Sequence, residues 1–142
     1  PPVEILAAAY PVMFPQWARR PASGGPGRHR GGLGAIYELE LLAQEAEVFL
    51  FGDRGRAGPP GVAGGGPGAT TRFTVLRADG RVEPAERSKL TGIRIHRGDR
   101  LRLETPGGGG WGDPRERTKA AIERDLALGY TTETGAAREV RG

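Results

Sequence analysis

Glycine most constrains what this chain can fold into, because it removes side-chain packing and raises the cost of ordering the backbone. The 142 residues include 25 Gly and 12 Pro. Most of the glycines fall in three loops, which span residues 21–34, 55–69 and 105–114. These loops share no fixed period, so the sequence is neither a collagen nor a repeat protein. We therefore expect placed connections between strands rather than one low-complexity chain.

The sequence between the loops predicts β-strands. Residues 12–20 form an extended segment that Pro15 restricts to an edge or bent strand. Residues 35–42 alternate apolar and polar side chains and residues 46–51 are a fuller apolar run, so we expect these two strands to pair as a hairpin. Residues 70–78 predict a further strand that ends in an Asp-Gly turn.

The second half of the chain predicts another hairpin and short helices. Residues 90–96 and 100–104 alternate on either side of a turn at Arg97-Gly98-Asp99. Helices are expected at residues 3–9, 118–129 and 132–140, with Thr118 as N-cap and Gly129 as the residue after the C-cap. The expected fold class is mainly β (α+β): a β-rich body with Gly-rich connecting loops and short C-terminal helices, in a single domain over residues 1–142.

Charge and composition exclude several classes of function. The net charge is +4, and all but two of the 21 basic residues are Arg. These arginines are scattered among Asp and Glu, and aromatic residues make up only 6% of the chain, so we expect no nucleic-acid partner. No run of about 18 apolar residues exists, so we expect no transmembrane helix and no membrane partner. Without Cys there is no disulfide, thiolate chemistry or Cys-based zinc site.

The glycine loops do not carry a phosphate-binding motif. The P-loop pattern is absent, and no glycine loop follows a strand and opens a helix in the required order. We interpret the loops as tight connections with close backbone approach, in this chain or against a neighbour. The two histidines do not suggest a metal site either, because Arg28 and Arg30 flank His29, and His96 shares a strand face with Arg94. We expect this chain to bind no metal and no cofactor.

Few residues are candidates for catalysis. Ser23 lacks the G-x-S-x-G elbow, so nothing supports a triad of Ser23, His29 and Asp53. Asp53 and Arg54 follow an apolar strand and are the candidates for a catalytic or ligand-binding pair, although such a pair more often closes a loop by ion pairing. Trp111 lies among glycines and is either an interface anchor or a lid over the end of the core.

The motifs taken together resemble a known family. Residues 23–34 are similar to the S-G-G-x-G-x-x-R-G-G-x-G segment of the hydantoinase B/oxoprolinase family. The order that follows also resembles the C-terminal region of that family, with Asp53-Arg54, residues 60–68, Lys89, Gly98-Asp99, residues 105–114, Arg117, Asp125, Gly129-Tyr130 and Ala136-Ala137. The loop residues singled out by this resemblance are Ser23, Gly24, Gly25, Arg30, Gly31, Gly32, Gly64, Gly65, Gly107, Gly108, Gly109, Gly110, Trp111 and Asp113.

The resemblance implies an ATP-dependent enzyme that acts on a ketone or a lactam. It implies a hetero-oligomer with larger hydantoinase A-type and B-type subunits in the cytoplasm, with ATP and a divalent metal (Mg²⁺ or Mn²⁺) bound in those partners. We expect a small, non-catalytic subunit of a ketone carboxylase similar to acetophenone carboxylase, which completes the B-type fold. The alternatives are a part of an N-methylhydantoinase or 5-oxoprolinase, and a non-enzymatic β-rich interaction module.

Overall fold

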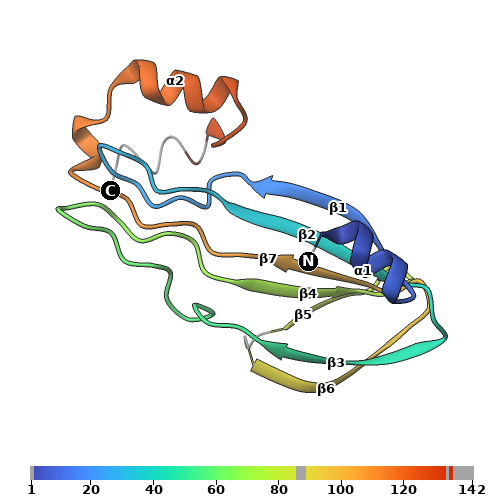
Figure 1. The fold of residues 1–142 in the computed structure, drawn as a ribbon. Helices are drawn as coiled ribbons and strands as arrows, with labels where there is room; N and C mark the ends of the chain where they lie inside the picture. The colour runs from blue at the N-terminus through green and yellow to red at the C-terminus, as the bar shows by residue number, and fades with distance from the viewer. Residues whose placement is uncertain (1, 86–88, 134, 136–142) are drawn as a thin grey trace. The chain divides into compact units, whose positions relative to one another are not determined.

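The computed structural model describes residues 2–85, 89–133 and 135 (Figure 1). The chain divides into two compact units. Unit 1 comprises residues 1–18, 36–53 and 72–104, and unit 2 comprises residues 19–35, 54–71 and 105–142. The single domain expected over residues 1–142 stays a prediction. The mainly β fold class is confirmed, because antiparallel sheets dominate and the helices are short.

Unit 1 holds almost all of the strands. The elements along the chain are α1 (Val3–Ala9), β1 (Val12–Arg20), β2 (Gly34–Leu41), β3 (Glu45–Phe51), β4 (Arg72–Leu76), β5 (Val82–Ala85), β6 (Lys89–His96) and β7 (Arg100–Glu104). One sheet has five strands in the order β1-β2-β7-β4-β5, and a second sheet consists of β3 and β6. The last residues of β1 and the first of β2 belong to unit 2.

The two predicted hairpins, β2 with β3 and β6 with β7, are wrong. The structure pairs β2 with β7 and β3 with β6, both antiparallel, so each predicted pair is divided between the two sheets. The Leu41 N–H donates to the carbonyl of Asp99 (3.0 Å), and the Arg97 N–H donates to the carbonyl of Gln44 (3.1 Å). These bonds hold the β2–β3 connection against the β6–β7 turn. The chain therefore passes from one sheet to the other twice, in the β2–β3 connection and in the β6–β7 turn, and these two crossings lie side by side.

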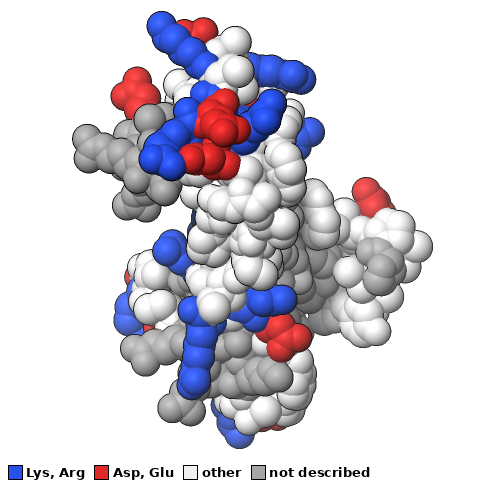
Figure 2. All heavy atoms as spheres, turned by 90° about the vertical axis from the view of Figure 1, so that its left-hand side faces the viewer, with Lys and Arg blue, Asp and Glu red and all other residues white. Residues whose placement is uncertain are grey.

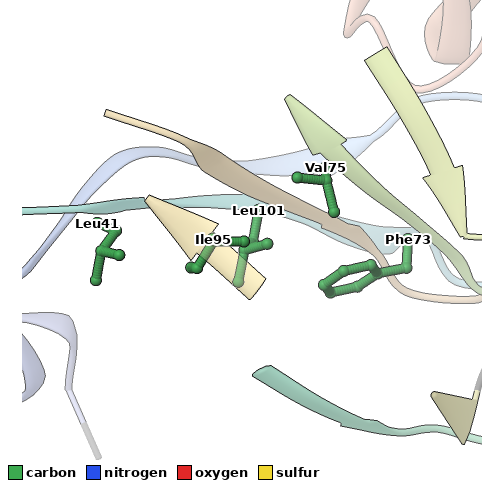
Figure 3. Packing of buried hydrophobic residues seen from close by; sticks show 5 residues of the cluster. All are labelled: Leu41, Phe73, Val75, Ile95 and Leu101. Atoms are coloured by element: carbon green, nitrogen blue, oxygen red, sulfur yellow. The ribbon is translucent and has the colours of Figure 1, made fainter. Parts of the chain in front are cut away.

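The core of unit 1 is apolar. It consists of Leu41, Phe73, Val75, Ile95 and Leu101, which come from both sheets (Figure 3). Alternation in β4 brings Phe73 and Val75 to one face, as the sequence predicts. Burial of each such side chain contributes about 1.5–3 kcal/mol, so this cluster is the main source of stability in unit 1.

Unit 2 contains little regular structure. Besides the ends of β1 and β2, its elements among the described residues are the 3₁₀-helix η1 (Pro114–Glu116) and α2 (Lys119–Ala127). The other described segments of unit 2 have neither helix nor strand over most of their length (Figure 1). Helix α2 begins as predicted, because the Thr118 hydroxyl accepts a hydrogen bond from the Ala121 N–H (3.3 Å). It ends before Gly129, whose φ is +66°. The helix expected at 132–140 lies mostly outside the described residues. Across the described ranges, no helix has the length and apolar character that a membrane crossing requires.

Candidate functional site

Three glycine-rich segments of unit 2 pack against one another through their backbones. We call residues 23–34, 58–68 and 105–112 together the glycine bundle. Among the glycines of the bundle, only Gly64 and Gly112 have positive φ (+90° and +76°). The remaining glycines of the bundle are therefore not explained by backbone conformations that other residues avoid.

Backbone hydrogen bonds connect the three segments of the bundle. The Gly25 N–H donates to the carbonyl of Gly108 (2.8 Å), which joins the first segment to the third. The Gly66 N–H donates to the carbonyl of Pro26 (2.7 Å), which joins the second to the first. The Gly110 N–H donates to the carbonyl of Gly66 (2.9 Å), which joins the third to the second. These bonds satisfy backbone groups that would otherwise need a sheet or water.

The segments approach too closely for side chains. A Cβ on Gly31 would lie 2.0 Å from the carbonyl oxygen of Gly108, and one on Gly107 would lie 1.9 Å from that of Ser23. Gly32 differs, because nothing lies within 4 Å of its Cβ position. Among the other predicted motif glycines, a Cβ would meet backbone at 1.9–2.3 Å at Gly24, Gly25, Gly65, Gly109 and Gly110. At these positions, with the exception of Gly32, close backbone approach within this chain thus requires glycine.

Two buried side chains tie together the ends of the glycine bundle. The Arg20 guanidinium donates from Nη1 to the carbonyl oxygens of Thr70 (2.7 Å) and Thr105 (2.9 Å). The Ser23 hydroxyl donates to the carbonyl of Arg20 (2.6 Å) and accepts from the Gly34 N–H (2.8 Å). Ser23 was singled out from the sequence, whereas nothing in the sequence distinguishes Arg20 from the other arginines.

A buried ion network lies where the bundle meets α2. Asp125 accepts from Arg30 Nε (2.8 Å) and also from Arg117, and the three side chains are only 8–12% exposed. Burial alone raises the pKa of the Asp125 carboxyl, but the hydrogen bond and charge of Arg30 and the charge of Arg117 outweigh it, so the pKa lies below its ordinary value. The resemblance included Arg117 and Asp125, but no spacing rule indicated that they meet Arg30.

A cavity of about 520 Å³ lies beside this network. It is lined by Arg28, His29, Arg30, Glu116, Arg117, Thr118, Ala121, Arg124, Asp125 and Tyr130. Figure 2 shows basic side chains gathered around acidic ones at the top of the view, the height at which α2 lies in Figure 1. Tyr130, an aromatic residue of the lining, contacts two arginines. Its hydroxyl accepts a hydrogen bond from Arg19 (2.7 Å), and its ring centroid lies 5.5 Å from the Arg30 guanidinium.

The structure does not bring Asp53 and Arg54 to this cavity. Both residues are exposed beyond the end of β3. Arg54 has a φ of +63°, and its carbonyl accepts from the Thr71 N–H (3.0 Å). Within the described ranges, no group of three or more His, Cys, Asp or Glu side chains is placed to hold a metal ion.

Trp111 and Asp113 occupy the end of the third segment. The backbone of Trp111 exchanges two hydrogen bonds with that of His29, each 2.9 Å, and the Trp111 side chain is about half exposed. The two alternatives for Trp111, interface anchor or lid, both stay predictions. Asp113 is the N-cap of η1, where its carboxylate accepts from the Arg115 N–H (2.9 Å).

Comparison with known proteins places these features in a family. The hydantoinase B/oxoprolinase family profile matches residues 1–114. An uncharacterized protein of Methanocaldococcus jannaschii is 34% identical over 88% of this chain. The caprolactamase subunit beta of Pseudomonas jessenii is 32% identical over 96% of this chain. The chain spans only 22% and 24% of the length of these two relatives.

Solved structures agree with the sequence comparison. The structure of the ATP-dependent caprolactamase from Pseudomonas jessenii matches 98% of this chain with a TM-score of 0.79 and 29% identity. It is covered over 24% of its own chain. Nucleotide-free acetone carboxylase has the same fold over 97% of this chain and 22% of its own, with a TM-score of 0.84 at 22% identity. The chain therefore belongs to the hydantoinase B/oxoprolinase family.

Proposed function

We propose that this chain is a non-catalytic part of the B-type component of an ATP-dependent, multi-subunit enzyme. The observation that carries the proposal is the glycine bundle, whose segments are held together by backbone hydrogen bonds, by the buried Ser23 and by the adjoining buried Arg20. Such a unit supports neighbouring protein rather than performing chemistry. The proposal includes larger A-type and B-type partners, with ATP and the divalent metal bound there, and a cytoplasmic location.

Two reactions are candidates for the whole enzyme. The first is carboxylation of a methyl ketone with bicarbonate through phosphorylated intermediates, similar to acetophenone carboxylase, which the sequence resemblance suggests. The second is ATP-dependent opening of a cyclic amide. The identity of 32% with caprolactamase subunit beta over 96% of this chain favours this second candidate.

Reconstitution with the co-purifying chains tests the structural role. We expect the complex to hydrolyse ATP, and to keep its turnover within about twofold when Asp53 becomes Asn or Arg54 becomes Gln, because neither contacts reacting groups in this proposal. Loss of turnover in either variant, with the complex intact by size-exclusion chromatography, would overturn the non-catalytic assignment. Purification of the native protein as a lone monomer would overturn the proposed assembly.

Substrate assays on the same complex separate the two reactions. ATP turnover is measured with acetophenone, with caprolactam, with hydantoins and with 5-oxoproline. Turnover on acetophenone that depends on bicarbonate supports the carboxylase. Turnover only on a cyclic amide rejects the carboxylase and supports the second candidate.

A further inference from the structure

The cavity beside α2 has a size and a charge that no part of the proposed function uses. Its volume of about 520 Å³ falls within the range of small-molecule sites. Among the residues that the structure describes, four arginines and two carboxylates line it: Arg28, Arg30, Arg117, Arg124, Glu116 and Asp125. The lining therefore carries a formal excess of two positive charges, which disfavours a metal cation and favours a dianion.

The arginines divide into an inner and an outer pair. Arg30 and Arg117 are fixed by Asp125 and form the inner wall. Arg28 and Arg124 are exposed at the rim. Arg28 pairs with Glu116 at 3.6 Å, but both side chains are more than half exposed, and such pairs are weak. In the part of the chain that the structure describes, Arg124 forms no ion pair.

We propose that this cavity binds a phosphate dianion, either free phosphate or the phosphate of a small monoester. Planar guanidinium groups donate two parallel hydrogen bonds to a phosphate, and Arg28 and Arg124 carry such groups at the rim. The Glu116 carboxylate competes with the phosphate for Arg28, because Arg28 must leave its ion pair with Glu116 to bind the ligand. The Tyr130 ring supplies an apolar surface for the ester group.

Titration of the purified 142-residue chain with inorganic phosphate by calorimetry tests this site, at constant ionic strength set with chloride. We expect saturable binding to one site. The double variant Arg28→Gln with Arg124→Gln should bind at least about tenfold more weakly, because two charge-assisted contacts are lost. Both residues are exposed, and an unchanged melting temperature confirms that the variant is folded.

Two further variants make the test specific. Glu116→Gln should bind phosphate about two- to fivefold more tightly, since it removes the competing carboxylate. Arg56→Gln removes the same charge from an exposed position of unit 2 that does not line the cavity, and should change binding by less than about twofold. Absence of saturable binding overturns the proposal. So does an effect of Arg56→Gln as large as that of the double variant, or weaker binding by Glu116→Gln.

A second probe distinguishes the two sources of the phosphate. Phenyl phosphate that binds at least as tightly as inorganic phosphate, with the same dependence on Arg28 and Arg124, identifies a monoester site. Binding of inorganic phosphate alone identifies a site for the free ion. These outcomes concern this chain alone and do not depend on the reaction of the assembled enzyme.

Discussion

The two units of this protein are stabilised in opposite ways. Unit 1 is stabilised by packing of apolar side chains, with a cluster of five buried residues contributed by both sheets. Unit 2 excludes side chains from its centre, so that backbones approach to hydrogen-bonding distance. The glycine-rich segments are therefore ordered, because most of their glycines each allow a close backbone contact that a side chain would prevent.

A buried carboxylate also joins separate segments in each unit, Asp99 in unit 1 and Asp125 in unit 2. In unit 1, Asp99 accepts from the N–H groups of Ala78 and His96 and from Arg77, each at 2.9 Å. In unit 2, Asp125 accepts from Arg30 and Arg117. The polar contacts are thus alike in the two units, and the difference lies in the packing.

The largest effect is expected for Gly31→Ala. Its Cβ would lie 2.0 Å from the carbonyl oxygen of Gly108, and neither backbone can yield without breaking the bundle. We expect a loss of more than about 3 kcal/mol in the free energy of unfolding, measured by urea denaturation. Gly32→Ala is the matched control, because nothing lies within 4 Å of its Cβ position and its effect should stay within about 0.5 kcal/mol. Equal effects of the two variants would show that close approach does not hold unit 2 together.

Unit 1 should respond to the opposite change, removal of side-chain atoms. Ile95 is 1% exposed, and Ile95→Ala should cost about 2–5 kcal/mol because it leaves a cavity in the core. Val82 is 62% exposed, and Val82→Ala should cost less than about 1 kcal/mol. Urea denaturation measures both. If amide hydrogen exchange quickens in the glycine bundle as much as in the strands, the two units are not separately stabilised.

Removing the charge of the buried carboxylate in unit 2 should cost about as much as a core cavity. Asp125→Asn leaves Arg30 and Arg117 without their shared anion, and we expect a loss of about 3 kcal/mol. Asp113→Asn makes the same chemical change at an N-cap, where Asn is as good as Asp, and should change stability by less than about 0.5 kcal/mol. A small effect of Asp125→Asn would show that packing alone fixes α2.

Acid should weaken both units through these carboxylates. Burial raises the pKa of Asp99, but the N–H groups of His96 and Ala78 and the Arg77 guanidinium outweigh it, so the pKa lies below its ordinary value of 3.8. The pKa of Asp125 is lowered as well. A lowered pKa gives stability that is complete above the unfolded value, about 4, and is lost as the pH falls through the folded pKa.

Melting temperatures measured between pH 7 and pH 2 follow this loss. We expect them to be constant down to about pH 5 and to fall below about pH 4. Asp99→Asn should lower stability at pH 7 and flatten the decline in acid, because one of the titrating groups is gone. A decline as steep in this variant as in the parent chain would exclude Asp99 as a source of the acid sensitivity.

The fold and the site differed in how far the sequence predicted them. Local signals placed β1 to β4, β6 and β7 to within a few residues but missed β5, and they identified Thr118 and Gly129 at the ends of α2. Strand pairing failed, because the shared bend at residues 42–44 and 97–99 depends on contacts between distant segments rather than on either connection alone.

The candidate site was harder to predict for the same reason. Arg30 and Asp125 are 95 residues apart, so neither the local alternation of side chains nor the spacing of motifs predicts their ion pair. The glycines were conspicuous in the sequence, yet their individual roles were not. Gly31 and Gly32 are adjacent and identical, and only the distance to Gly108 distinguishes a required glycine from a tolerant position.

The smallest expected effect is a gain, from Ala63→Gly in the glycine bundle. Ala63 has a φ of +52°, a left-handed conformation that costs an alanine about 1–2 kcal/mol and glycine almost nothing. Glycine also loses more conformational entropy on folding, which costs about 0.5–1 kcal/mol. We therefore expect a net gain of about 0.5 kcal/mol in the free energy of unfolding. Urea midpoints of the parent, Ala63→Gly and the exposed control Ala57→Gly measure it, and the control should lose stability. If Ala63→Gly also loses stability, unit 2 uses the Ala63 methyl group, and the rule that its stability comes from excluding side chains does not extend to this position.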